Sequence, residues 1–212
     1  MFTQRNYHYP VPDKNRELRA VLEERVKSDQ SRGVASGLST QRFPPEGPVL
    51  VISRRWPDLA ACEANLKYVQ SDPTQQAYQA KVASLQIKPI KQELFQTLIQ
   101  LPPRTGQPGF TQRISFYPAA DKGPELRAVL EERVKRAPSR GVAAGLSIQR
   151  FGPEGAIYVV SQGWPDLAAY EANLQAQQSD PTFRPFQSKV ASLTRQPNKQ
   201  ELFQALIPLP PM

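Results

Sequence analysis

The chain carries two kinds of hydrophobic pattern that follow one another along the sequence. Residues 2–9 alternate in character and are rich in aromatic side chains, which predicts a β-strand. The next segment repeats its apolar residues at i, i+3, i+4 and i+8, the spacing of one α-helical face. These residues are Leu18, Val21, Leu22 and Val26. Asp13 is expected to cap this helix, and Gly33 to follow its end.

A hairpin and a second helical region follow the first helix. Two strand-like runs, residues 35–43 and 49–56, flank a turn segment rich in Pro and Gly. A second helix is expected to begin at Asp58 and to break at residues 71–73, before a further helical stretch and a last strand, 92–100. The residues predicted to point inward from this second helix are Leu59, Cys62, Leu66 and Val69. The order of elements is therefore β-α-β-β-α-β.

All of these patterns occur twice, at a constant offset that takes Phe2 to Phe110 and Trp56 to Trp164. Residues 17–27 return unchanged as residues 125–135, and roughly two-thirds of all positions are identical between the copies. Asp121 is the second copy of the capping Asp13. The predicted organisation is a first repeat at residues 1–103, a Pro/Gly linker at 104–109 and a second repeat at 110–212.

Each repeat predicts a ferredoxin-like α+β fold, with two helices on one face of a four-stranded antiparallel sheet. The third strand, Val49 to Ile52, is apolar on both sides, so the other face is expected to be buried as well. With two copies in one chain, the two sheets are expected to pack against each other as an intramolecular, pseudo-twofold α+β barrel. A barrel of about eight strands holds side chains or one small ligand, so its lumen is the expected binding site.

Composition and charge exclude several classes of function. The chain has one cysteine, Cys62, and one histidine, His8, so neither a disulfide nor a Cys/His metal centre is expected. A net charge of +8 suggests an acidic partner, but the third strand lacks the aromatic signature of RNA-recognition modules. No apolar run reaches the length of a membrane helix. We therefore expect a cytoplasmic protein without membrane, nucleic-acid, metal or cofactor partners.

The segment 51–66, which carries Trp56, resembles the strand–Trp–helix signature of the antibiotic-biosynthesis-monooxygenase-like family, and residues 159–174 resemble it again. The resemblance implies the dimeric α+β barrel fold, which members usually form as homodimers of one repeat. This chain would then be a monomeric pseudo-dimer, with further dimerisation left open. The family includes cofactor-independent oxygenases and haem-degrading enzymes. The latter are disfavoured, because Tyr78 and Phe186 stand near the expected position of the haem-ligating histidine.

The candidate site residues are indoles, strand-borne amides and cations. Candidate catalytic residues are Trp56, Trp164, Arg42, Arg150 and His8. Candidate ligand-binding residues are Gln4, Asn6, Gln41, Trp56, Gln112, Gln149 and Trp164. An indole N–H and a guanidinium could stabilise a phenolate or enolate, and His8 could act as a base. The alternative is structural: core tryptophans, solvated arginines and an idle histidine.

The repeats diverge at several places, one of which is the first strand. If alternate residues of that strand face the lumen, Gln4, Asn6 and His8 form a polar wall, whereas Ile114 and Phe116 make the second wall apolar. Such asymmetry fits one working pocket, and it fits drift equally well. The leading hypothesis is a barrel that binds a small, partly aromatic molecule, with cofactor-independent monooxygenation as the reaction if there is one. The alternative is a non-catalytic structural or interaction protein with a side-chain-filled barrel.

Overall fold

The computed structural model describes residues 1–45, 47–102, 109–150, 152 and 154–210, and these form two compact units. Unit 1 comprises Met1–Leu94 and Gln204–Met212, and unit 2 comprises Phe95–Phe203. The predicted linker at 104–109 lies outside the described residues except for Gly109. Each unit therefore takes most of one repeat and the last strand residues of the other.

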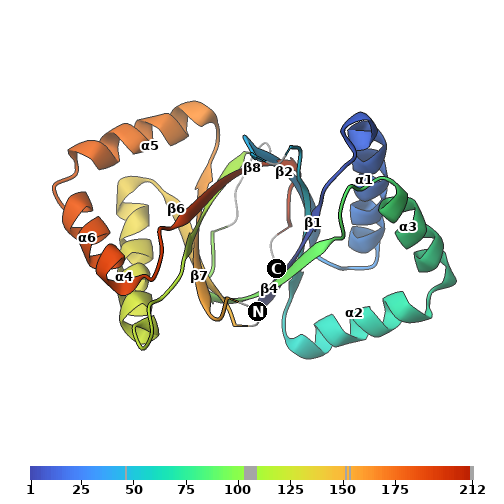
Figure 1. Ribbon diagram of the computed structural model, residues 1–212, viewed down its shortest axis with the longest axis horizontal. Helices are drawn as coiled ribbons and strands as arrows, with labels where there is room; N and C mark the ends of the chain where they lie inside the picture. The colour runs from blue at the N-terminus through green and yellow to red at the C-terminus, as the bar shows by residue number, and fades with distance from the viewer. Residues whose placement is uncertain (46, 103–108, 151, 153, 211–212) are drawn as a thin grey trace. The chain divides into compact units, whose positions relative to one another are not determined.

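Unit 1 has the predicted order of elements (Figure 1). Its complete strands are β1 (Phe2–His8), β2 (Ser36–Arg42) and β3 (Leu50–Trp56). Its helices are α1 (Asn15–Ser31), α2 (Leu59–Ser71) and α3 (Pro73–Ser84), with a short 3-10 turn η1 (Pro12–Lys14) ahead of α1. All three helices lie on the same side of the unit 1 strands (Figure 1).

Unit 2 repeats this arrangement. Its complete strands are β5 (Phe110–Phe116), β6 (Ala143–Gln149) and β7 (Ile157–Trp164). Its helices are α4 (Gly123–Arg136), α5 (Leu167–Ser179) and α6 (Phe183–Leu193), with a 3-10 turn η2 (Ala137–Arg140) after α4. Gly141, with a φ of 70°, ends this turn in the left-handed conformation that glycine favours.

The eight strands form a closed antiparallel ring in the order β1-β3-β2-β8-β5-β7-β6-β4, which confirms the predicted α+β barrel. The ring closes because β4 (Lys91–Ile99) and β8 (Lys199–Ile207) each pass from one unit into the other. The second half of β4 pairs with β6 in unit 2, where Phe95 lies opposite Gln149. The second half of β8 belongs to unit 1, where Leu206 and Ile207 pack against its hydrophobic core. We refer to this arrangement as the strand exchange.

Glycine makes room for the exchanged segments. A Cβ atom on Gly37 of β2 would lie 2.8 Å from the backbone of Leu209, and one on Gly145 of β6 would lie 2.6 Å from Leu101 N. At both distances a real Cβ atom would collide with the neighbouring backbone, so only glycine fits at these two positions. The same residue type at the same repeat position therefore allows each sheet to accept its incoming strand.

Each sheet has a helix-covered face and a helix-free face. In unit 1, Leu50 and Ile52 belong to the core that packs against α1, and they lie opposite His8 and Asn6 in the β1–β3 register. Directly opposed residues point to the same face. Even-numbered residues of β1 therefore face the helices, and Tyr7 belongs to the helix-free face. The same register places Phe116 and Ile114 of unit 2 on its helix-covered face.

Two predicted details are wrong. Asp13 and Asp121 do not cap the first helices, since Lys14 and Lys122 occupy the N-cap positions without a side-chain bond. Leu59 and Leu66 of α2 are exposed rather than inward, and Cys62 is the one buried residue of that helix. Within the described residues, no helix combines the length and apolar character needed to cross a membrane.

Candidate functional site

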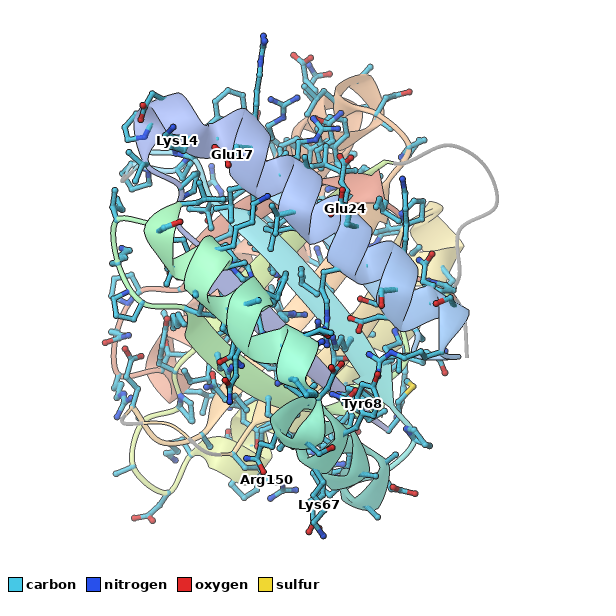
Figure 2. All side chains as sticks on the ribbon, turned by 90° about the vertical axis from the view of Figure 1, so that its right-hand side faces the viewer. Lys14, Glu17, Glu24, Lys67, Tyr68 and Arg150 are labelled. Carbon is cyan, nitrogen blue, oxygen red and sulfur yellow. The ribbon has the colours of Figure 1, made fainter. Side chains whose placement is uncertain are left out.

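The buried stripe of α1 changes from apolar to charged along the helix. The apolar residues of this buried stripe are Leu18, Leu22 and Val26. The same face of the helix also carries Arg25 and Asp29, which are buried as well. Figure 2 looks onto this helix from outside, with Glu17 and Glu24 labelled on it. The helix thus inserts an ion pair between itself and the helix-covered face of the unit 1 sheet.

Asp29 is fully buried and is surrounded by three arginines. Its carboxylate lies 3.1 Å from Arg25 Nε, 2.7 Å from Arg32 Nη2 and 2.7 Å from Arg54 Nε. Arg54 Nη1 also donates to the Asn6 side-chain oxygen at 3.2 Å, in the amide orientation that satisfies both groups. We call these five residues the Asp29 cluster. One carboxylate among three guanidinium groups leaves a positive surplus, which favours an anion nearby.

Aromatic and thiol side chains from α2 and α3 surround this cluster. Arg25 stacks over the Tyr78 ring at 5.4 Å and also bonds Gln75. Burial raises the pKa of the Tyr78 hydroxyl, and Arg54 and Arg25 oppose that effect. Burial also raises the pKa of the Cys62 thiol, against the charge of Arg54. Both groups are therefore neutral hydrogen-bonding partners at neutral pH.

His8 lies at the other end of the same face and is 2% exposed. Neither ring nitrogen has a hydrogen bond of good geometry among the described residues. Burial, followed by the charge of Arg54, lowers the His8 pKa to about 4, and the nearby Gln86 side chain opposes this weakly. His8 is therefore neutral at pH 7 and is too weak a base to accept a proton readily there.

Trp56 ends β3 two residues after Arg54 and shares its face of the sheet. The indole is 4% exposed, and its Nε1–H has no acceptor in the described part of the chain. No aromatic ring packs against Trp56 within the same described residues. A buried donor without a partner is unfavourable by about 1–3 kcal/mol, so this N–H is available to a ligand oxygen.

Unit 2 fills most of the equivalent space with apolar and aromatic side chains, although Arg133, the counterpart of Arg25, remains and stacks over Phe186. Tyr170, the counterpart of Cys62, packs edge-on against Trp164 with ring centroids 5.9 Å apart. Its hydroxyl lies 3.4 Å from Gln112 Nε2. Ala137 replaces Asp29, and Phe186 replaces Tyr78. A ring of its own unit thus packs on Trp164, whereas no aromatic ring of the described residues packs on Trp56, although both indoles are equally buried.

The helix-free faces differ as well. In unit 1, Glu93 accepts hydrogen bonds from Lys91 and Tyr7, and Arg5 adds its charge. Burial opposes ionisation, but these groups together hold the pKa of the Glu93 carboxyl below its usual value. In unit 2 the matching ion pair joins Lys199 and Glu201 at 3.0 Å, and the tyrosine position is a serine.

The structure separates the candidate residues into three groups. The helix-covered faces carry Gln4, Asn6, His8, Trp56, Gln112 and Trp164. The helix-free faces carry Gln41 and Gln149, by the registers of β2 and β6. Exposed strand ends carry Arg42, bonded to Gln204, and Arg150, bonded to Gln96 at 2.8 Å. Gln4, Asn6 and His8 thus face the helices instead of the lumen.

Asp29, Arg25 and Arg54 were missed as site residues. A signal was present in the sequence, because Arg25 and Asp29 continue the spacing of Leu18 and Leu22 and so fall on the buried face of the helix. Charged residues on a predicted buried stripe need partners. Among the described residues, no three His, Cys, Asp or Glu side chains gather as a metal-binding group.

Comparisons with solved structures extend over both repeats. A provisionally assigned monooxygenase from Fusobacterium nucleatum has a TM-score of 0.75 at 11% identity, over 97% of this chain and 92% of its own. One from Lactobacillus acidophilus NCFM has a TM-score of 0.65 at 10% identity, over 98% of both chains. An anthrone oxidase-like protein has a TM-score of 0.64 at 15% identity, over 97% of this chain and 91% of its own.

These likenesses establish the fold. The chain is an α+β barrel protein with both repeats in one polypeptide, and it shares this fold with the neighbours named above. No protein-family model matches the sequence, and the comparison with curated proteins finds no match.

Proposed function

We propose that the protein binds a small aromatic molecule with an acidic oxygen at Trp56 in unit 1, and that it oxygenates this molecule without a cofactor. The observation that carries the proposal is the buried indole of Trp56, whose N–H has no acceptor in the described part of the chain and which lies beside the cationic Asp29 cluster. The solved neighbours assigned as monooxygenases support the same reaction class.

Tyr170 of unit 2 indicates where an aromatic substrate ring would lie. That ring packs on Trp164, and its oxygen reaches a polar strand residue, Gln112. In unit 1 the smaller Cys62 leaves the corresponding side of Trp56 without a ring. A planar substrate stacked there would direct an oxygen toward Gln4, the counterpart of Gln112, and toward Arg54, which lies opposite Gln4 on the same face.

Oxygenation without a cofactor needs a substrate anion that reacts directly with O₂. Preorganised cations and N–H donors stabilise such an anion most strongly where water is excluded. In the reaction, an activated CH₂ group loses both hydrogens and gains one oxygen atom of O₂ as a carbonyl, and the other oxygen atom leaves as water. The surplus charge of the Asp29 cluster and the Trp56 N–H would stabilise the developing negative charge.

The test measures O₂ consumption with anthrone and its dihydroxy derivative dithranol as substrates. Trp56→Phe removes the N–H donor and is expected to lower the rate about 10²-fold, the usual effect of losing one oxyanion donor. Cys62→Tyr, which copies unit 2, is expected to abolish binding. Trp164→Phe and Cys62→Ala are the matched controls and should stay near the rate of the unmodified protein.

Two results would contradict the proposal. Equal loss of rate in Trp56→Phe and Trp164→Phe would mean that the indoles only support the fold. Quenching of Trp56 fluorescence by dithranol without O₂ uptake would retain the binding site and remove the reaction, leaving a non-catalytic binding protein.

A further inference from the structure

The helix-free face of unit 2 contains a buried guanidinium group with unused donors. Arg113 on β5 is 7% exposed and stacks on the Phe203 ring, 4.0 Å from its centroid. Its Nε and Nη1 are buried and have no acceptor in the described part of the chain. Leaving charged donors unpaired in a buried position is costly, so this group points to a missing acceptor.

Glu201 shares this face with Arg113. It lies on β8 two residues before Phe203, and successive odd residues of a strand point to one side. The Glu201 carboxylate pairs with Lys199 at 3.0 Å, and its side chain is 11% exposed. The face thus offers an acceptor on Glu201 and donors on Arg113.

In unit 1, a tyrosine hydroxyl occupies the matching place on the helix-free face. Its counterparts of Arg113 and Glu201 are Arg5 and Glu93, and Tyr7 lies on the same strand as Arg5. The Tyr7 hydroxyl donates to Glu93, and the side chain is 6% exposed. In unit 2 the position of Tyr7 is taken by Ser115, which is only half-buried.

We propose that unit 2 binds a phenol at this position, with the ligand ring beside Ser115 where unit 1 has its own tyrosine ring. The phenol hydroxyl donates to Glu201 and accepts from Arg113. This site lies in the other unit and on the other sheet face from the Trp56 site, so it is a second ligand site, independent of the proposed oxygenation.

The probe is p-cresol, which is the tyrosine side chain cut off beyond its Cβ. Saturation-transfer NMR is expected to show saturable binding of p-cresol to the full chain. Toluene, which lacks the hydroxyl, is expected to bind at least about tenfold more weakly, because it gives Arg113 no acceptor and Glu201 no further donor.

Ser115→Tyr supplies the ring covalently and is the decisive variant. It is expected to abolish p-cresol binding and to raise the thermal unfolding midpoint, whereas Ser115→Ala should keep the binding. Arg113→Met, which retains the packing on Phe203, should lower the affinity about tenfold or more and serves if Ser115→Tyr does not fold.

The proposal is overturned if the unmodified protein shows no saturable p-cresol binding. It is also overturned if Ser115→Tyr and Arg113→Met both bind p-cresol as well as the unmodified protein does. Because p-cresol also resembles the ligand proposed for the Trp56 site, the titration is repeated in Cys62→Tyr, in which that site is closed. Saturable binding that persists there and that Ser115→Tyr removes belongs to unit 2, so failure of this site and failure of the oxygenase site can be told apart.

Discussion

The two repeats solve the packing of helices on a sheet in different ways. Unit 1 places Asp29 and its arginines between α1 and the sheet, together with His8. Unit 2 places Ala137 and Phe116 at the matching positions, within a continuous apolar core. Since the backbones repeat the same elements, this fold does not require the ionic cluster. Replacing a buried ion network by apolar side chains is often neutral or stabilising. The cluster of unit 1 is therefore better explained by a site than by stability.

The largest expected difference between the two units comes from removing the carboxylate of Asp29. Asp29→Ala gives unit 1 the residue of unit 2 but leaves Arg25, Arg32 and Arg54 without their acid. We expect a loss of about 3–5 kcal/mol in the free energy of unfolding, or about 10 °C in melting temperature, measured by urea titration and calorimetry.

The control for this variant copies more of unit 2. The triple variant Asp29→Ala, Arg54→Gln and Asn6→Ile removes the orphaned guanidinium and restores apolar packing, so it should recover about half of the loss or more. If Asp29→Ala alone costs less than about 1 kcal/mol, the value of an exposed pair, then the cluster is not buried as a unit.

The next effect is the pH dependence that His8 contributes, which unit 2 lacks at the matching position, Phe116. His8 has a pKa of about 4 in the folded protein against 6.5 ordinarily, so between these values the unfolded chain binds a proton that the folded chain does not. Stability is full above pH 6.5 and falls as the pH drops toward 4, by on the order of 3 kcal/mol. His8→Phe, which copies Phe116, should flatten this slope in urea titrations at pH 7 and 4.5. An unchanged slope would assign the pH dependence to other groups.

The smallest effect should be equal in the two units. Asp58 and Asp166 cap α2 and α5, and each accepts a backbone N–H at 2.8 Å, from Ala61 and Ala169. Asp58→Ala and Asp166→Ala should each cost about 1 kcal/mol by thermal denaturation. A clear difference between them would show that one helix is held by more than its cap.

Local patterns predicted the elements but not the sheet face to which each side chain points. The spacing of Leu18 and Val26 predicted the buried side of α1 correctly, because apolar residues repeated along one side of a long helix are buried together. The alternation of β1 predicts two faces, one with the odd-numbered and one with the even-numbered residues. Only the pairing of His8 with Leu50 shows that the even-numbered residues face the helices. Leu59 and Leu66 share a helical face with Cys62, yet spacing does not tell whether a neighbour covers it.

Long-range pairings were beyond the reach of sequence patterns. Arg54 and Asp29 lie 25 residues apart. The local pattern around each residue does not indicate that the two side chains pair. The strand exchange is equally non-local, since β4 reads as the last strand of its own repeat until its pairing with β6 is known.

Because of the strand exchange, a single repeat does not contain all the strands of one unit. Residues 1–103 by themselves would lack the second half of β8 that unit 1 uses, and would carry the second half of β4 with no sheet to join. Such a fragment could satisfy both ends only by finding another copy. With both repeats in one chain, this reciprocal exchange is completed within a single molecule. The two copies in this single chain differ at two such positions: Cys62 corresponds to Tyr170, and Ser115 corresponds to Tyr7.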